Sequence, residues 1–342
     1  MKELVVISGK GGSGKTSVAA SFAVLADQAV IADCDVDAAD LHLILSPQIN
    51  ERHEFYSGNE AVISQKDCIG CGACLAYCRF GAVVRAAEAS SAPTSPGTNT
   101  VCKECDFCVR SCPVKANEMI LAMKEACGHL NNEATFYIDP VACEGCGVCV
   151  QFCPVQAIDF PERLCGEWMV SDTRHGPMVH ARLGIAAENS GKLVCTVRRE
   201  ARRIAEERDH KLIIVDGPPG IGCPVIASIT GSDLVLAVTE PTLSGEHDFK
   251  RVLQLARHFG IPLAVCINKW DLNEEMSGRI EAFCNEQSIP VAGKIRYDQA
   301  FTRTQIQGQA LVEAEEHGAA ADLRNLWTAI SDSIQTVRQS EM

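Results

Sequence analysis

The feature that most constrains the fold is a glycine-rich loop near the N-terminus. Residues 9–16, GKGGSGKT, match the pattern G-x-x-x-x-G-K-[ST]. The apolar run Leu4–Ile7 precedes the loop, and an apolar-periodic segment follows it to about Ala26. Backbone N–H groups in such a loop converge on phosphate oxygens, and the helix N-terminus adds partial positive charge. The pattern therefore predicts a phosphate-binding turn between a buried strand and a helix.

The loop also predicts roles for its side chains. Lys15 is expected to reach the β- and γ-phosphates of a nucleotide, and the Thr16 hydroxyl to ligate Mg²⁺. The other loop residues expected to contact the nucleotide are Gly9, Gly11, Gly12, Ser13 and Gly14.

Strand and helix patterns alternate over much of the chain. Short apolar runs at 29–32, 211–220, 233–241 and 262–271 predict strands, and 247–259, 274–287 and 320–338 predict helices. Alternation of this kind is typical of an α/β fold with a mostly parallel sheet and helices on both faces.

Cysteines form the second strong pattern. The chain has 19, and 12 of them fall in three runs with the spacing C-x₂-C-x₂-C-x₃-C. In a run of this kind three thiolates hold one [4Fe–4S] cluster, and the fourth Cys serves the other cluster of a two-cluster unit. Zinc is the alternative, although zinc sites need only C-x₂-C pairs. The runs are Cys68, Cys71, Cys74 and Cys78; Cys102, Cys105, Cys108 and Cys112; and Cys143, Cys146, Cys149 and Cys153.

Three runs leave the pairing open, because only two are needed for a two-cluster unit. We therefore expect two to three [4Fe–4S] clusters. The cysteine-rich segment has α/β sequence on both sides, which predicts an inserted, small α+β ferredoxin-like domain at 62–165. The flanking segments 1–61 and 166–342 then form one P-loop domain.

Charge and hydropathy exclude several classes of protein. The formal net charge is −13 with no basic block, so we expect no nucleic-acid partner. No apolar run approaches the roughly 18 residues of a membrane span, and the last helix has no basic excess, so we expect no membrane binding. Leu4–Ile7 is too short for a secretory signal, so we expect a cytoplasmic protein with reduced cysteines.

The pattern KGGxGKT resembles the deviant Walker A motif of ATPases of the MinD, ParA and nitrogenase-iron-protein class. This resemblance implies that Lys10 crosses to the nucleotide of a second copy, in a homodimer formed with ATP. It implies that Asp35 orients the attacking water and that Asp33 lies near the metal. Asp216, at the end of KLIIVD, corresponds to the acid that holds Mg²⁺ through water.

The same resemblance assigns three further segments. Residues 217–220, GPPG, correspond to the second switch, and Asn268 in INKWD corresponds to the adenine-reading residue. Asp271 is compatible with guanine-binding motifs as well. Cys223 follows Asp216 at the offset of the cluster-bridging cysteine in the nitrogenase iron protein, and Cys195 is the nearest candidate for its companion. A packed or idle thiol is the alternative for this pair.

Together these stretches resemble P-loop ATPases of the MinD/ParA/Mrp superfamily that carry an inserted ferredoxin-type domain. The resemblance implies a Mg²⁺-dependent ATPase with Lys10, Lys15 and Asp35 as catalytic residues. The first functional hypothesis is that the protein couples ATP-dependent dimerisation to electron transfer or cluster delivery, and that its partner is an unknown redox or cluster-accepting protein. The alternatives are a ferredoxin-like carrier whose docking is regulated by nucleotide, and a positioning ATPase with structural clusters.

Overall fold

The computed structural model describes residues 1–85, 136–184 and 190–336. Two compact units are present. The first comprises Met1–Phe55 with Cys165–Met342, and the second comprises Tyr56–Leu164. The chain passes between the units within two strands, β3 (Gln48–Asn59) and β8 (Glu162–Thr173), so the second unit begins earlier than residue 62.

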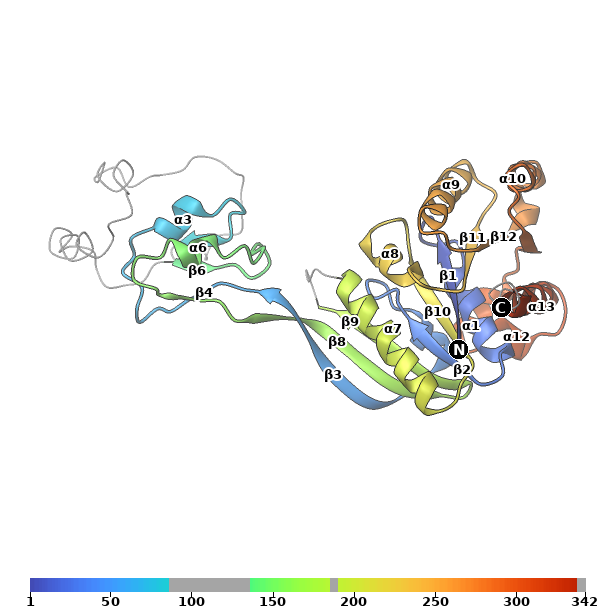
Figure 1. The fold of residues 1–342 in the computed structure, drawn as a ribbon, viewed down its shortest axis with the longest axis horizontal. Coiled ribbons are helices and arrows are strands. Elements are labelled where there is room, and N and C mark those ends of the chain that lie inside the picture. Colours follow the sequence, from blue (N-terminus) through green and yellow to red (C-terminus); the bar gives the residue numbers. More distant parts are fainter. Residues whose placement is uncertain (86–135, 185–189, 337–342) are drawn as a thin grey trace. The chain divides into compact units, whose positions relative to one another are not determined.

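The first unit is built on a nine-stranded sheet with the order β13-β12-β11-β1-β10-β2-β9-β8-β3 (Figure 1). The strands from β13 to β9 pair in parallel, and β8 pairs antiparallel with β9. The remaining strands are β1 (Lys2–Ser8), β2 (Ala29–Asp33), β9 (Gly176–Leu183), β10 (Leu212–Pro219), β11 (Leu234–Thr239), β12 (Leu263–Asn268) and β13 (Val291–Ile295).

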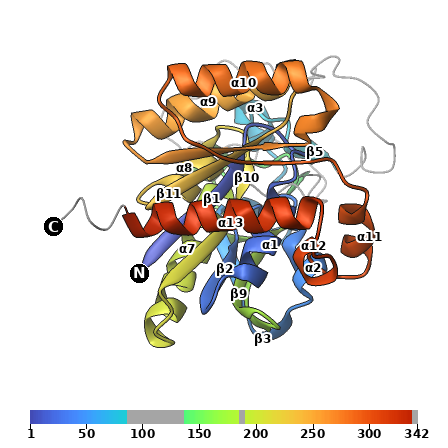
Figure 2. The same ribbon diagram turned by 90° about the vertical axis from the view of Figure 1, so that its right-hand side faces the viewer.

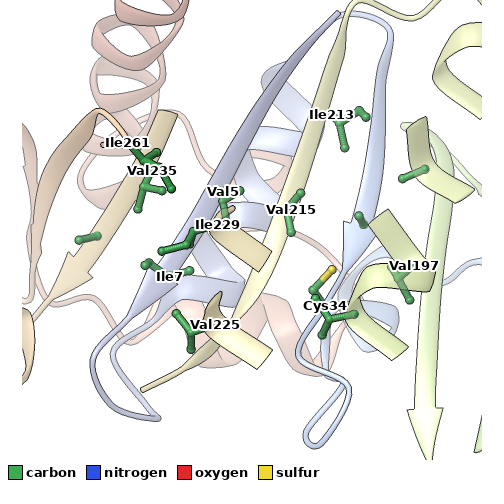
Figure 3. Packing of buried hydrophobic residues seen from close by; sticks show 14 of the residues in the cluster. Val5, Ile7, Cys34, Val197, Ile213, Val215, Val225, Ile229, Val235 and Ile261 are labelled. Carbon is green, nitrogen blue, oxygen red and sulfur yellow. The ribbon is translucent and has the colours of Figure 1, made fainter. Parts of the chain in front are cut away.

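The central strands are buried on both faces because apolar residues fill successive positions, as in Leu4–Ile7 of β1 and Leu212–Val215 of β10. Leu4 and Val6 of β1 pack into one hydrophobic cluster, and Val5 and Ile7 pack into the other. Figure 3 shows the second of these clusters, where Val5 and Ile7 meet Val225 and Ile229. Alternate side chains of a strand point to opposite faces, so each strand contributes to two cores.

Helices cover both faces of this sheet. One cluster contains α7 (Ser190–Glu207), α8 (Cys223–Ile229), α9 (Leu243–His258) and α10 (Glu274–Glu286), and Figure 2 shows α9 and α10 side by side. The other contains α1 (Lys15–Leu25), α2 (Leu41–Leu45), α11 (Ala300–Ile306), α12 (Leu311–Ala314) and α13 (Ala319–Thr336). A short 3₁₀ turn, η2 (Trp270–Leu272), follows β12.

The predicted α/β fold with a mostly parallel sheet is confirmed. The predicted strands and helices lie within a few residues of β1, β2, β10, β11, β12, α9, α10 and α13. The sequence analysis did not identify β9, β13 or α7. The α7 sequence is rich in arginine, but its buried stripe of Leu193, Val197 and Ile204 has helical spacing and could have been recognised in the sequence.

The second unit has a small core of its own. Two antiparallel strand pairs, β4 (Val62–Ile63) with β7 (Ile158–Asp159) and β5 (Val83–Arg85) with β6 (Phe136–Ile138), accompany α3 (Ala73–Tyr77) and α6 (Val148–Gln151). Ile63, Val83, Phe136 and Ile158 form the buried centre. Of the helices in the described ranges of both units, none is long and apolar enough to cross a membrane.

Candidate functional site

The phosphate loop connects β1 to α1, as the sequence predicted. Gly12 and Gly14 have φ angles of 80° and 89°, in the left-handed region that favours glycine. At Gly14 a side chain is excluded for a second reason, because its Cβ would collide with the Asn268 amide. The α1 helix therefore starts at Lys15 with the loop backbone held close to the turn after β12.

Lys15 lies among three acidic residues from neighbouring strand ends. Its Nζ is 2.6 Å from Asp35 Oδ2 and 3.4 Å from Asp216 Oδ1. Burial alone would lower the pKa of Lys15, but the charges of Asp216 and Asp35 outweigh it and raise the pKa above its usual range. Lys15 is therefore a cation held in place by carboxylates.

The acidic side is deeply buried. Asp33 and Asp216 are almost inaccessible to solvent, and burial raises the pKa of both carboxyl groups, with mutual repulsion adding to the effect for Asp33. Within the described residues, Asp33 Oδ2, Asp216 Oδ2 and the Ser13 hydroxyl have no hydrogen-bond partner. Three carboxyl groups with one ammonium and two unpaired oxygens suit a divalent cation, and Mg²⁺ accepts one or two carboxylates together with phosphates and water.

The two candidate switch segments are tied to each other and to the loop. Cys34 N–H donates to the Asp216 carbonyl at 2.8 Å, and Asp35 N–H donates to Asp33 Oδ1 at 3.2 Å. Gly220, after β10, has a φ of 94° and donates its N–H to the Ser8 carbonyl at 2.8 Å. Movement of either segment therefore acts directly on the phosphate loop.

Asn268 lies at the end of β12 and is 5% exposed. Its Nδ2 donates to the Ser13 carbonyl at 2.8 Å, and its Oδ1 accepts the N–H of Lys269 at 3.0 Å. The amide that the sequence analysis assigned to adenine thus braces the phosphate loop. Asp271 is exposed, and its Oδ1 accepts the Tyr297 N–H at 2.7 Å.

Lys10, the early lysine of the loop, points to the segment after β11. Its ammonium pairs with Glu240 and lies 3.4 Å from Thr242 Oγ1 and 3.1 Å from Ser244 Oγ. Lys269 binds the other oxygen of Glu240 at 3.2 Å and the Gly12 carbonyl at 3.2 Å. The sequence analysis did not identify Glu240, because nothing in the local pattern TEPT marks it as a site residue.

The cysteines of the first and third runs line two cavities in the second unit. One has about 320 Å³ of empty space, part of it open to solvent, and the other about 350 Å³. The larger is lined by Cys78 together with Cys143, Cys146 and Cys149, and the smaller by Cys153 together with Cys68, Cys71 and Cys74. Each run therefore supplies three cysteines to one cavity and its fourth to the other.

The remaining cysteine predictions have different outcomes. The middle run, Cys102, Cys105, Cys108 and Cys112, lies outside the described residues. Cys195 on α7 and Cys223 at the start of α8 are both exposed. A Cβ on Gly191, one turn before Cys195, would lie 3.5 Å from the Cys223 Cβ, so the start of α7 passes close to Cys223. A bridging role for this pair stays a prediction.

Fold and site together define a P-loop nucleotide-binding protein. Residues 4–312 match the CobQ/CobB/MinD/ParA nucleotide binding domain, and the chain belongs to this family. A relative from Methanocaldococcus jannaschii, Uncharacterized protein MJ0578, is 29% identical over 279 residues, which is 79% of each chain. A second protein from the same organism, MJ0579, is 23% identical over 52% of this chain and 58% of its own.

Solved structures show the same fold. The septum site-determining protein MinD of Pyrococcus horikoshii, determined with Mg-ADP, has a TM-score of 0.52 at 14% identity and covers 96% of this chain and 95% of its own. MinD in the MinC:MinD complex of Aquifex aeolicus has a TM-score of 0.51 at 14% identity, with coverages of 97% and 96%.

Proposed function

We propose that this protein is a Mg²⁺-dependent ATPase that carries iron–sulfur clusters and couples ATP-dependent pairing of two copies to electron transfer or cluster delivery. The observation that carries the proposal is the combination, in one chain, of a P-loop site with two cavities lined by four cysteines each. The family membership supports the nucleotide half, and the cysteine geometry supports the cluster half.

The cavity lining favours clusters over zinc. Zinc sites need only C-x₂-C pairs, whereas each run here carries a third and a fourth Cys at the spacing of a ferredoxin run. Each of the two cavities is lined by four cysteines, the number of thiolates that a [4Fe–4S] cluster needs.

The crossing of the fourth cysteines is the second support. Cys78 and Cys153 each close the cavity of the other run, which is the ligation expected of paired [4Fe–4S] clusters. Ala157 N–H donates to Cys153 Sγ at 3.2 Å, a bond that stabilises a thiolate at this position. Clusters held there would supply one-electron transfer.

At the nucleotide site, each side chain has a definite task. Backbone N–H groups of the loop bind phosphate oxygens, and Lys15 exchanges its contact with Asp35 for the β- and γ-phosphates. Asp35 is then free to accept a proton from the attacking water. Thr16, whose hydroxyl donates to Asp216, and Asp216 itself would hold Mg²⁺, which supplies charge neutralisation at the phosphates.

Two alternative functions predict different results in the same experiments. A ferredoxin-like carrier with nucleotide-regulated docking predicts that the reduction potentials are identical in ATP and ADP. A positioning ATPase predicts ATP-dependent dimers whose behaviour is unchanged when the clusters are reduced. We favour the coupled function because the Cys34 N–H bonds to the Asp216 carbonyl, which links the two switch segments, and because Asp35 pairs with Lys15 of the phosphate loop. Nucleotide that binds Lys15 would therefore act on both segments.

Three measurements test the proposal. Anaerobic reconstitution should give about 8 iron atoms per chain from the two cavities, or about 12 if the middle run holds a third cluster. Light scattering after size exclusion should show dimers in ATP and monomers in ADP. Anaerobic redox titration in each nucleotide should give different curves. Zinc without visible absorbance would contradict the cluster half, and superimposed titration curves would favour the carrier.

The partner is best sought directly. Affinity capture from anaerobic lysate with and without ATP should retain a redox or cluster-accepting protein in only one nucleotide state. A partner retained equally in both states would remove nucleotide control of docking.

A further inference from the structure

The ammonium of Lys10 is completely satisfied within its own chain. An ammonium has three donors, and Lys10 has three acceptors in Glu240, Thr242 and Ser244. All three acceptors come from one segment, residues 240–244, between β11 and the first turn of α9. The loop backbone is held against the same helix, since a Cβ on Gly9 would collide with Asp248. Lys10 is thus bound in cis by a single connecting segment.

Glu240 is the only charged acceptor among the three, and it serves two lysines. One oxygen pairs with Lys10 and the other with Lys269, and the Glu240 side chain is 14% exposed. Burial would raise the pKa of Glu240, but the bonds from Lys10 and Lys269 outweigh it and lower the pKa below its usual range. The carboxyl group is therefore ionised at neutral pH.

Without Glu240 this position would repel Lys10. The N-terminus of α9, where Thr242 accepts the Gly245 N–H at 3.0 Å, carries partial positive charge. Lys269 adds a full positive charge nearby. The Glu240 carboxylate pairs directly with both lysines and so offsets these two contributions, and its loss should release the Lys10 side chain rather than leave it in place.

We propose that Glu240 is a positioning residue that holds Lys10 in its own subunit and so limits its availability to the nucleotide of a second copy. The inference rests on the proposed ATP-dependent pairing, in which Lys10 crosses to the partner. Glu240 then competes with the partner's phosphates for the same ammonium. The competition sets the protein concentration at which two ATP-bound copies associate.

The test compares Glu240→Gln with a matched control, Glu281→Gln. Glu281, on α10, is also partly exposed and pairs with Lys294 at 2.7 Å. Its change to Gln removes the same charge at a position that does not contact the phosphate loop. Trace acetylation, read by mass spectrometry without nucleotide, should label Lys10 about two- to fivefold faster in Glu240→Gln, given the usual strength of partly exposed ion pairs. The control should label Lys10 at the wild-type rate.

Dimerisation gives the second readout. Each dimer forms only after the Lys10–Glu240 contact breaks in both subunits. In Glu240→Gln the dissociation constant of the ATP-bound dimer should therefore fall by about the square of the two- to fivefold change, ~4- to 25-fold. If Glu240 acts through Lys10, Glu240→Gln should have no further effect on dimerisation in a Lys10→Ala background. A purely structural role of Glu240 would leave its effect on dimerisation in place there.

The outcomes separate this inference from the proposed function. Unchanged Lys10 labelling together with ATP-dependent wild-type dimers would overturn the role of Glu240 alone. A wild type and Glu240→Gln that both stay monomeric in ATP would overturn both ideas. A Glu240→Gln protein that pairs more weakly than wild type would show that Glu240 supports pairing rather than opposes it, and would also overturn the inference.

Discussion

Lys15 and Asp35 form an ion pair of 2.6 Å in the interior of the phosphate loop site, where each residue is 6% exposed. Phosphates that reach Lys15 must compete with this carboxylate. Lys15 is also the cation that balances the negative charge of three acidic side chains, Asp33, Asp35 and Asp216. Nucleotide affinity and stability of the empty site are therefore linked through one ammonium.

Lys15→Ala should weaken both properties. The variant leaves buried carboxyl groups without their cation, which costs roughly 3 kcal/mol of unfolding free energy. Isothermal titration should show ATP affinity reduced by at least about tenfold. Lys250→Ala is the control, because Lys250 is partly exposed and its partner Glu246 keeps a second cation in Arg279, so the change should cost less than about 1 kcal/mol. Full ATP affinity in Lys15→Ala would contradict the assignment.

Asp35→Ala should separate binding from hydrolysis. Removing the carboxylate that holds Lys15 leaves the ammonium free for phosphate, so ATP should bind at least as tightly as in the wild type. Loss of the proton acceptor should slow hydrolysis by about 10²- to 10⁴-fold. The variant should accumulate as a dimer in ATP, measured by light scattering. Near-normal turnover would remove Asp35 from the reaction.

Asn268→Ala tests the hydrogen bond from the Asn268 amide to the Ser13 carbonyl of the phosphate loop. The Ser13 carbonyl loses its donor, with an expected cost of about 1–3 kcal/mol, and ATP affinity should fall because the loop is no longer held in shape. Asn273→Ala is the matched control. Asn273 accepts the Met276 N–H and caps α10, so its loss should lower stability without changing ATP affinity. Equal affinity losses in the two variants would indicate a general effect of stability.

Acid should destabilise the fold through His180. Burial lowers the pKa of His180 to about 4, helped by the positive charges of His42 and Arg52, whereas Glu167 acts in the opposite direction. The unfolded chain gains a proton near pH 6.5 and the folded one does not, so stability falls as the pH drops from about 6.5 to about 4. The loss attributable to His180 is about 3 kcal/mol.

The measurement is urea unfolding of the cluster-free protein across that pH range. His180→Gln places its amide where Nε2 lies and so keeps a hydrogen bond to Ser171, which lies 2.8 Å from His180 Nε2. Its midpoint should decline less steeply with acid than that of the wild type. Parallel pH profiles would show that His180 does not carry the effect.

The crossed cysteines predict an unusual pattern of iron loss. Cys153→Ala and Cys78→Ala should each lose about half of the iron held by the two cavities. The double variant Cys153→Ala with Cys68→Ala should lose no more iron than either single variant, because both cysteines line the same cavity. Combining Cys153→Ala with Cys146→Ala should empty both cavities. The opposite result would mean that each run holds its own cluster.

Local patterns made much of the fold and site predictable. The phosphate loop, its strand and its helix are neighbours in sequence, so glycine spacing and apolar runs were sufficient to identify them. The spacings of the first and third cysteine runs were equally readable, and these cysteines line two cavities. The α7 helix has apolar residues at helical spacing and could have been found from the sequence, whereas β9 and β13 were missed because their burial patterns depend on neighbouring strands.

The sequence by itself determined the pattern of the phosphate loop and the runs of four cysteines, since both depend on spacing within a few residues. Only the tertiary structure decided which distant groups meet them. Strand order brings Asp216 beside Lys15 and the turn after β12 beneath Gly14, and packing within the second unit brings Cys153 to the cavity of Cys68. Such contacts join segments far apart in the chain, and no local pattern encodes them because they arise from burial of apolar surface over the whole domain.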